Sequence, residues 1–340
     1  MDDYWTPEEV EEASRAIERK GPPLPTYWRE KYEQEARKSW DLFYRRNVDK
    51  FFKDRHYLGK VFPEVAETEA DRELANSLAR VEGVRDNNGV RKGGRGRLGR
   101  RTLLELGCGV GNAAFPLLED NAGLYVIAVD LSPRGIEVLQ QHPMYTCGRC
   151  EALVLDATGE DLPACVLEDG GVDLVLMQFS LSAVAPKDMA AAARLVERAL
   201  KPGGKLLIRD YGRFDEAQLR FAKGRRLGDN VYVRQDGTTS FFFSLEDLRL
   251  LFGGGSSTGT PPQDETTDTA AAAGAAAPSS LQAGSVSPNL GDATIRSGGS
   301  GANLIEEELS FVRRQYANRE QKVARRRVWV HGKFRKPGGT

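Results

Sequence analysis

The stretch that decides the fold is "LLELGCGVGN", residues 103–112. A short apolar run ends in glycines at alternate positions, Gly107, Gly109 and Gly111. Because glycine has no Cβ, backbone in such a loop can approach a ligand where a side chain would block it. The rival interpretation is the dinucleotide fingerprint GxGxxG, which places a helix N-terminus under a pyrophosphate. The spacing here is GxGxG, and Glu105 stands two positions before the first glycine.

The chain that follows this loop alternates between strand-like and helix-like segments. We expect strands at residues 102–106, 124–130, 151–156, 172–179 and 205–210, and helices starting near residue 112 and spanning residues 132–141 and 186–204. Continuous apolar strands separated by helices are typical of a parallel sheet covered on both faces. The sequence therefore predicts an α/β fold of the Rossmann-like kind.

Acidic residues mark three successive strands of this predicted sheet. Glu105 lies in the first, Asp130 ends the second and Asp156 ends the third. A carboxylate at Asp130 can accept hydrogen bonds from ribose hydroxyls, as in NAD proteins, so this residue alone does not identify the cofactor. With GxGxG, the set resembles the class I S-adenosylmethionine-dependent methyltransferases. That resemblance places Glu105 near the methionine amino group and Asp156 at the adenine amino group; a nucleotide-binding oxidoreductase is the alternative.

Composition excludes some classes of protein. The 340 residues are 40% hydrophobic, and no run approaches the roughly 18 apolar residues of a membrane span. Residues 1–20 are acidic, unlike a transit peptide, so we expect a cytoplasmic or nuclear protein without membrane contact. The cysteines are Cys108, Cys147, Cys150 and Cys165. One CxxC without a second lacks the four ligands of structural zinc, so we expect no metal and reduced thiols.

The chain divides into five segments by composition. They are a helical N-terminal region that caps the site (1–60), a variable segment with a basic Gly/Arg-rich loop (61–101), the core (102–252), a low-complexity insertion (253–303), and a final antiparallel hairpin with a basic tail (304–340). The insertion has no aromatic residue, so we expect it to be disordered. An apolar stripe at helical spacing runs through Trp28, Tyr32, Ala36, Trp40, Phe43 and Tyr44.

Basic and aromatic residues interleave in "NVDKFFKDRHYL", residues 47–58. Cations can bind phosphates and rings can stack on bases, so the stretch fits a nucleic-acid contact. It fits the solvated edge of a helix equally well. Basic runs at residues 91–101 and 313–336 allow the same two interpretations. They could bind a polyanionic partner, or they could form an ordinary solvated surface.

A family resemblance favours the nucleic-acid interpretation over the helix edge, and three motifs carry it. "FFKDRHYL" (51–58), "LLIRDYG" (206–212) and "YVRQDGT" (232–238) together resemble the eukaryotic transfer-RNA 3-methylcytidine methyltransferases. The likeness covers about residues 26–252 and 304–337; the insertion, the Gly/Arg-rich loop and Cys147 depart from it. It implies a mostly parallel seven-stranded sheet, S-adenosylmethionine as cofactor, and methylation of cytidine 32 in the anticodon stem-loop of tRNA. A helper such as seryl-tRNA synthetase or another tRNA-binding protein is an expected partner.

Two sets of candidate residues follow from these motifs and the resemblance. Cofactor contacts are expected at Trp40, Tyr44, Glu105, Gly107, Gly109, Gly111, Asp130, Asp156, Ala157 and Gln178. Substrate contacts are expected at Lys53, Arg55, His56, Phe179, Arg209, Tyr211 and Arg234. Phe179 would stack on a flipped base, although core packing is the alternative. Arg225, Arg226 and Arg325–Arg327 would add affinity outside the cleft.

Asp210, in "LLIRDYG", is the candidate catalytic residue. The ring nitrogen of cytosine has an in-plane lone pair and is neutral near pH 7, so its methylation needs no base. The product ring is cationic, and a carboxylate would stabilise the developing charge. The alternative for Asp210 is a helix cap or an ion pair with Arg209 or Arg213. Small-molecule methylation on the same fold, or a non-catalytic scaffold, are the competing functions.

Overall fold

The computed structural model describes residues 6–82, 97, 99–159, 161–254, 295, 300–318 and 323–339. Two sequence predictions fall largely beyond these residues. They are the Gly/Arg-rich loop within residues 61–101 and the disorder expected between residues 253 and 303. The fold and the site are built entirely from the described parts.

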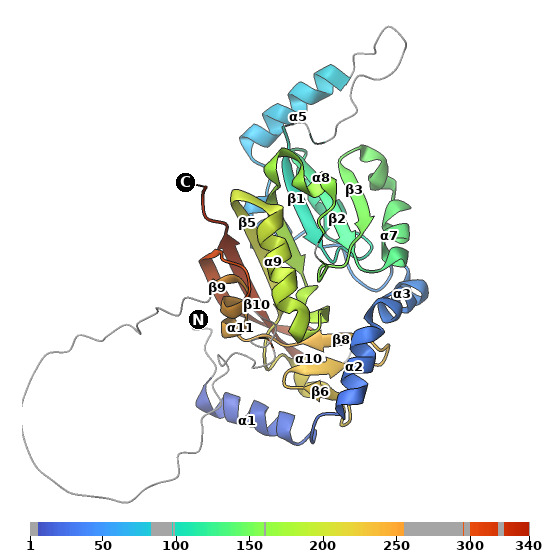
Figure 1. Cartoon of the computed structure of the whole chain (residues 1–340), viewed down its shortest axis with the longest axis vertical. Coiled ribbons are helices and arrows are strands. Elements are labelled where there is room, and N and C mark those ends of the chain that lie inside the picture. Colours follow the sequence, from blue (N-terminus) through green and yellow to red (C-terminus); the bar gives the residue numbers. More distant parts are fainter. Residues whose placement is uncertain are drawn as a thin grey trace, which may run out of the picture.

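A seven-stranded sheet in the order β3-β2-β1-β4-β5-β10-β9 forms the centre of the molecule (Figure 1). Its strands are β1 (Arg101–Leu106), β2 (Leu124–Asp130), β3 (Cys150–Val154), β4 (Val172–Gln178), β5 (Leu200–Tyr211), β9 (Ile305–Asn318) and β10 (Val323–Arg335). The first five run parallel, and β10 pairs antiparallel with both β5 and β9. This confirms the predicted fold, including the C-terminal hairpin.

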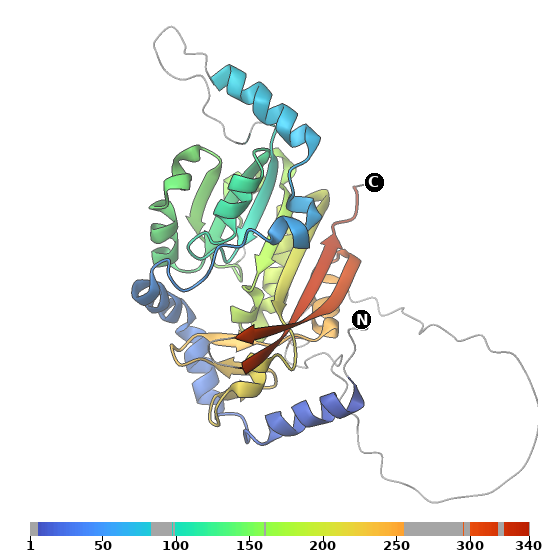
Figure 2. The same ribbon diagram turned by 180° about the vertical axis from the view of Figure 1, so that it is seen from behind.

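Apolar residues alternate along the strands and supply a core on each face of the sheet. In β1, Leu104 packs with α9 (Met189–Ala199) and α11 (Leu245–Phe252) on the face seen in Figure 1. Leu103 belongs to a second core cluster, which includes residues of α4, α6 and α7. Bounds for these helices are α4 (Leu58–Val61), α6 (Ala114–Asp120) and α7 (Pro133–Gln140). Figure 2 shows the molecule from behind. Helix α5 (Glu69–Glu82), of 14 residues, precedes β1, and the short helix α8 (Ala164–Leu167) precedes β4. No described helix is both long and apolar enough to cross a bilayer.

The N-terminal region consists of separate helices, α1 (Pro7–Glu18), α2 (Thr26–Gln34) and α3 (Ala36–Asn47). The predicted apolar stripe is therefore interrupted at Glu35, whose φ of −89° and ψ of 6° leave helical geometry. Because of this interruption, the aromatic residues of α2 and α3 lie in different surroundings. Trp28 on α2 is 38% exposed, whereas Tyr44 on α3 is 4% exposed. The helices α2 and α3 lie along one side of the domain, with α3 beside α7 (Figure 1).

A small three-stranded sheet, which the sequence analysis did not predict, follows α10 (Glu216–Arg220). Its strands are β6 (Arg226–Gly228), β7 (Val231–Val233) and β8 (Thr239–Phe241). Strands of three residues are too short for a periodic signal. Turns at Asn230 and Gly237, both with positive φ, connect them. Short 3-10 helices complete the chain, namely η1 (Pro63–Val65), η2 (Pro143–Cys147), η3 (Glu168–Gly170), η4 (Leu181–Ala183) and η5 (Pro186–Asp188).

The two ends of the predicted insertion are held together by backbone hydrogen bonds. The N–H of Gly254 donates to Ala302 O at 2.9 Å, and that of Ala302 donates to Leu251 O at 2.7 Å. Within the segment, Ile295 is 2% exposed and belongs to the core under α11. The domain is therefore closed across the insertion, and Ile295 contributes to its packing.

Candidate active site

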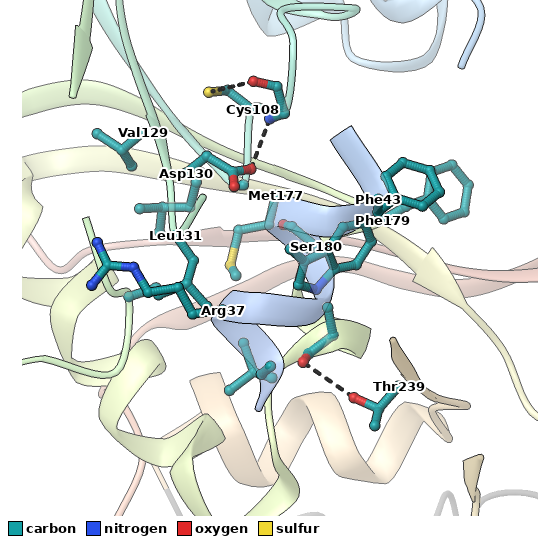
Figure 3. A pocket seen from close by; sticks show the side chains of 18 of the residues that line it. Arg37, Phe43, Cys108, Val129, Asp130, Leu131, Met177, Phe179, Ser180 and Thr239 are labelled. Carbon is teal, nitrogen blue, oxygen red and sulfur yellow. Dashed lines mark hydrogen bonds between the residues drawn. The ribbon is translucent and has the colours of Figure 1, made fainter. Parts of the chain in front are cut away.

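A cavity of about 470 Å³ opens at the carboxyl ends of β1, β2, β4 and β5. In open α/β sheets this edge is where ligands bind, and the volume is typical of a small-molecule site. Figure 3 shows Asp130 from the end of β2, and Phe179 and Ser180 from the turn after β4, around this space. Helix α3, with Arg37 and Phe43, crosses over it.

The glycine loop after β1 is shaped by close neighbours as well as by positive φ angles. A Cβ on Gly107 (φ 78°) would lie 2.4 Å from Ser180 Cβ, and one on Gly109 (φ 57°) would lie 2.7 Å from the Tyr44 hydroxyl. Both glycines line the cavity. Gly111 does not, because its α-carbon faces the ring of Phe115. Of the three glycines, two can meet a ligand and the third allows packing.

The Asp130 carboxylate lines the cavity and is held by two backbone amides. Oδ2 accepts from Gly109 N–H at 2.8 Å, and Oδ1 accepts from Ser132 N–H at 2.9 Å. Burial raises the pKa of Asp130 to about 6, so it is ionised at neutral pH. Each oxygen keeps a lone pair for a further donor. The arrangement suits the paired hydroxyls of a ribose.

Glu105 is buried beneath the loop, and neither of its carboxylate oxygens has a hydrogen-bond partner among the described residues. Burial raises its pKa to about 8, and the positive charge of Arg55 opposes that shift. A buried, unpartnered carboxylate favours a cationic group brought by a ligand. Glu105 does not itself line the cavity, so its place at the ammonium end of S-adenosylmethionine stays a prediction.

Three other predicted cofactor residues line the cavity, namely Asp156, Ala157 and Gln178. Asp156 Oδ1 accepts from the backbone N–H and the hydroxyl of Thr158, at 2.9 and 2.6 Å. The Gln178 carbonyl accepts from Arg55 Nη1 at 3.2 Å. Gln178 Nε2 donates to the Tyr57 hydroxyl at 3.1 Å. Gln178 therefore connects the end of β4 to the segment before α4.

Helix α3 contributes Trp40 and Tyr44 to the cavity. The Tyr44 ring lies against Gly109 and also against Gly135, where a Cβ would come within 3.2 Å of it. A residue that the sequence analysis missed fixes this helix: Asp41 accepts from the Ser132 hydroxyl and, at 3.3 Å, from Arg134 N–H. A single acid on a mixed helix gives no sequence signal of such a role.

The stretch "FFKDRHYL" is an irregular segment that wraps the glycine loop, rather than the edge of a helix. Arg55 N–H donates to Asn112 O at 2.9 Å, and the Asn112 side chain donates to Asp54 at 3.0 Å. Of its predicted substrate residues, only Arg55 lines the cavity. Lys53 is exposed, and His56 lies outside near Asp120. Asn112 is the last residue of the glycine-loop motif "LLELGCGVGN". Its residue type alone did not indicate the contact with Asp54.

Asp210 lies behind the cavity wall, fully buried within β5. Its carboxylate accepts from Ser182 N–H at 2.9 Å and from Tyr211 N–H at 2.8 Å, so it caps η4. Burial raises its pKa to about 6. The cap that the sequence analysis kept as an alternative is present, and a catalytic role stays a prediction. Arg209 lies outside the cavity, with its guanidinium carbon 4.9 Å from the Trp329 ring centre.

Phe179, Tyr211 and Arg234 meet at one end of the cavity. Phe179 has a φ of 57°, which for a bulky residue stores on the order of 1–3 kcal/mol of strain. Its ring centre lies 5.1 Å from that of Tyr211 and 5.7 Å from the Arg55 guanidinium carbon. Arg234 lies 5.6 Å from the Tyr211 ring centre and donates to Ser240 Oγ at 3.0 Å. These groups form an aromatic, cationic end to the site.

The described residues contain no cluster of three or more histidine, cysteine or acidic side chains placed to hold a metal ion. Cys147 is exposed and Cys150 is partly buried at the start of β3.

The strand order, the glycine loop and the acids Glu105 and Asp130 define a class I methyltransferase. A family model described as "Methyltransferase domain" matches residues 104–206. The tRNA N(3)-cytidine methyltransferase METTL6 of Mus musculus is 43% identical over 229 residues, covering 67% of this chain and 72% of the relative. The tRNA N(3)-methylcytidine methyltransferase Mettl2 of Drosophila melanogaster is 35% identical over 311 residues, covering 91% and 74%. This chain belongs to that family.

Among solved structures, a SAM-dependent methyltransferase from Anabaena variabilis superposes with a TM-score of 0.48 at 11% identity, covering 88% of this chain and 94% of that one.

Proposed function

We propose that this protein transfers the methyl group of S-adenosylmethionine to N3 of cytidine in tRNA, at position 32 of the anticodon loop. The observation that carries the proposal is the identity of 35–43% to relatives named for this reaction. The cavity supports it, because groups suited to the cofactor, such as Asp130, and groups suited to a base, such as Phe179 and Tyr211, line the same cavity. The position in the loop rests on the sequence resemblance.

The chain's own residues divide between holding the cofactor and orienting it. Glu105 would pair with the ammonium group, Asp130 would accept from the ribose hydroxyls, and Asp156 would accept from the adenine amine. When bound, S-adenosylmethionine supplies an electrophilic methyl on a sulfonium. Helix α3, anchored through Asp41, would close the site from above and exclude water.

The opposite end of the cavity suits an unstacked base. Phe179 and Tyr211 present rings at which a flipped cytosine could stack, and anticodon loops supply unpaired bases. The nucleophile is the neutral ring nitrogen, so the residues need only hold it in line with the methyl carbon. Positive charge develops on the base as the methyl group is transferred. The ionised Asp210, buried behind the cavity wall and bonded to η4, would stabilise this charge electrostatically.

Mass spectrometry of nucleosides tests the proposal directly. Purified protein, S-adenosylmethionine and tRNA lacking the modification should yield 3-methylcytidine. A matched tRNA with uridine in place of cytidine 32 should yield none. Methylation that persists in the uridine variant would move the target to another position. Absence of 3-methylcytidine from every tRNA tested, with or without a helper, would overturn the function itself.

We also infer that recognition is completed by a helper protein that binds tRNA. Seryl-tRNA synthetase is our first candidate, on the sequence resemblance. Adding seryl-tRNA synthetase should raise the methylation rate on serine tRNAs. It should leave unchanged the rate on an anticodon stem-loop that does not come from a serine tRNA. If activity on all tRNAs is full without a helper, this part of the proposal fails and the enzyme acts alone.

A further inference from the structure

A cluster of rings and guanidinium groups continues from the base-binding end of the cavity onto strand β10. Its members are Phe179, Tyr211, Trp329, Arg209, Arg234 and Arg327, and we call them the arginine–aromatic cluster. The strand register explains it, because Trp329 pairs directly with Tyr211 across β10 and β5. Cross-strand neighbours on one face of a sheet are in contact. The hairpin therefore reaches the wall of the active site.

Arg327 is held in this cluster by a buried carboxylate. Its Nε donates to Asp215 Oδ2 at 2.9 Å and to Oδ1 at 3.2 Å, and Asp215 is fully buried. Its guanidinium carbon lies 5.6 Å from the Tyr211 ring centre and 5.9 Å from that of Trp329. Arg234 lies at the same distance, 5.6 Å, from the Tyr211 ring. Two guanidinium groups thus hold one ring of the cavity wall.

The neighbouring Arg326 faces away from the cluster. Successive residues of a strand point to opposite sides of the sheet. Arg326 is exposed, and its charge acts on Glu9 of α1. By composition alone, the run "RRR" at 325–327 indicates one basic patch for phosphates. In the structure, Arg326 and Arg327 serve different surfaces.

We propose that Arg327 is a positioning residue for methyl transfer: it holds the Tyr211 ring in the plane against which the target base stacks. This inference rests on the proposed function and adds a component from the last strand of the fold. Arg326, in contrast, contributes to RNA affinity through charge alone. The matched pair Arg327→Gln and Arg326→Gln separates the two roles.

The experiment measures three quantities on the full chain with a tRNA that the wild type methylates. They are the single-turnover rate at saturating tRNA, the dissociation constant of tRNA over a salt series, and the S-adenosylmethionine affinity. R327Q should lower the rate about tenfold or more, because a misplaced ring misaligns the base, while tRNA affinity changes little. R326Q should weaken tRNA binding, reduce the logarithmic salt slope by about one, and lower the rate at saturating tRNA less than R327Q does.

A second variant guards against unfolding, since R327Q leaves Asp215 without its cation. Arg327→Lys keeps a positive charge opposite Asp215 but lacks the planar group that lies on the rings. It should retain the melting temperature and still lose rate at saturating tRNA. Equal rates for R327K and wild type, or equal rate losses in R327Q and R326Q, would overturn the inference. A wild type that forms no 3-methylcytidine would instead refute the proposed function.

Discussion

At the scale of single residues, the site contains two carboxyl groups, Glu105 and Asp130, for which burial makes the charged form less favourable. Glu105, near the end of β1, has no hydrogen-bond partner for its carboxylate within the described part of the chain, whereas Asp130, at the end of β2, has two backbone donors. The pKa of Glu105 rises to about 8 and that of Asp130 only to about 6. Burial is the largest cause in both. The difference follows from the hydrogen bonds that favour the charged form of Asp130.

The first prediction follows from the pKa of Glu105. Below pH 8 the free protein holds this carboxyl protonated, so pairing with an ammonium group must release a proton. Affinity for S-adenosylmethionine should therefore rise with pH between about 6 and 7.5, by at most about tenfold per unit. Glu105→Gln should bind more weakly and lose this dependence. Isothermal titration in buffers of different ionisation enthalpy measures both, with the exposed Glu119→Gln as control. A pH-independent wild type would contradict the pairing.

The second prediction concerns Asp210. Asp210→Asn replaces one acceptor by a donor that faces a backbone N–H, so stability should fall by about 1–3 kcal/mol. If the charge also acts on the base, the single-turnover rate should fall on the order of a hundredfold. The rate is measured below the unfolding temperature of the variant. Cofactor affinity should be retained. Urea unfolding and single-turnover methylation separate the two effects. Normal turnover with reduced stability would leave Asp210 as a cap of η4 only.

At the scale of elements, the segment between α3 and α4 combines two functions within a few residues. Arg55 lines the cavity, contacts Gln178 and affects Glu105, whereas Lys53 is exposed. The segment binds the glycine loop through Asn112. Its basic residues therefore cannot be treated as one RNA-binding patch.

The third prediction distinguishes the role of Lys53 from that of Arg55. Lys53→Ala should weaken tRNA binding and lower the logarithmic salt slope by about one, with cofactor affinity unchanged. Arg55→Ala should reduce the rate and alter cofactor affinity, because it removes a positive charge that acts on Glu105. Filter binding over a salt series and cofactor titration test each variant. Full tRNA affinity with an unchanged slope in Lys53→Ala would remove this residue from the RNA interface.

Sequence predicted the elements with strong periodicity and missed those that depend on tertiary contacts. β2 was predicted at residues 124–130, the bounds it has in the structure, because both faces of this strand are apolar. The break at Glu35 could not be predicted, since Trp28 and Tyr44 share a helical spacing yet pack on different neighbours. Tyr211 and Arg234 were expected near the base, but the part played by Trp329 depends on strand register across the insertion.

At the scale of the whole molecule, residues distant in sequence assemble the site. Helix α3, the irregular segment before α4, and strands β1 to β5 surround the cavity, and β10 supports one wall. The N-terminal region is joined to the small sheet as well, since Leu24 N–H donates to Arg226 O at 2.7 Å. Opening the N-terminal region would expose cofactor and base positions together. Cofactor exchange and RNA release are therefore expected to be linked.

The last prediction concerns the low-complexity segment that separates α11 from β9. Backbone hydrogen bonds join its ends at Gly254 and Ala302, so the domain does not need the intervening length for closure. Replacing residues 256–292 by a short Gly/Ser linker should preserve stability, because closure entropy changes only slowly with loop length, about 0.6 kcal/mol per doubling. Methyl transfer should also be preserved. Urea unfolding and single-turnover methylation measure the two properties.

A longer deletion, residues 256–299, provides the matched comparison. It also removes Ile295, which is 2% exposed within the core under α11. Loss of that buried side chain should lower the free energy of unfolding by about 1.5–3 kcal/mol relative to the shorter deletion. Equal stability of the two would show that Ile295 contributes nothing to the core. A shorter deletion that folds but transfers no methyl group would show instead that the segment contributes to methyl transfer, through the tRNA or a partner.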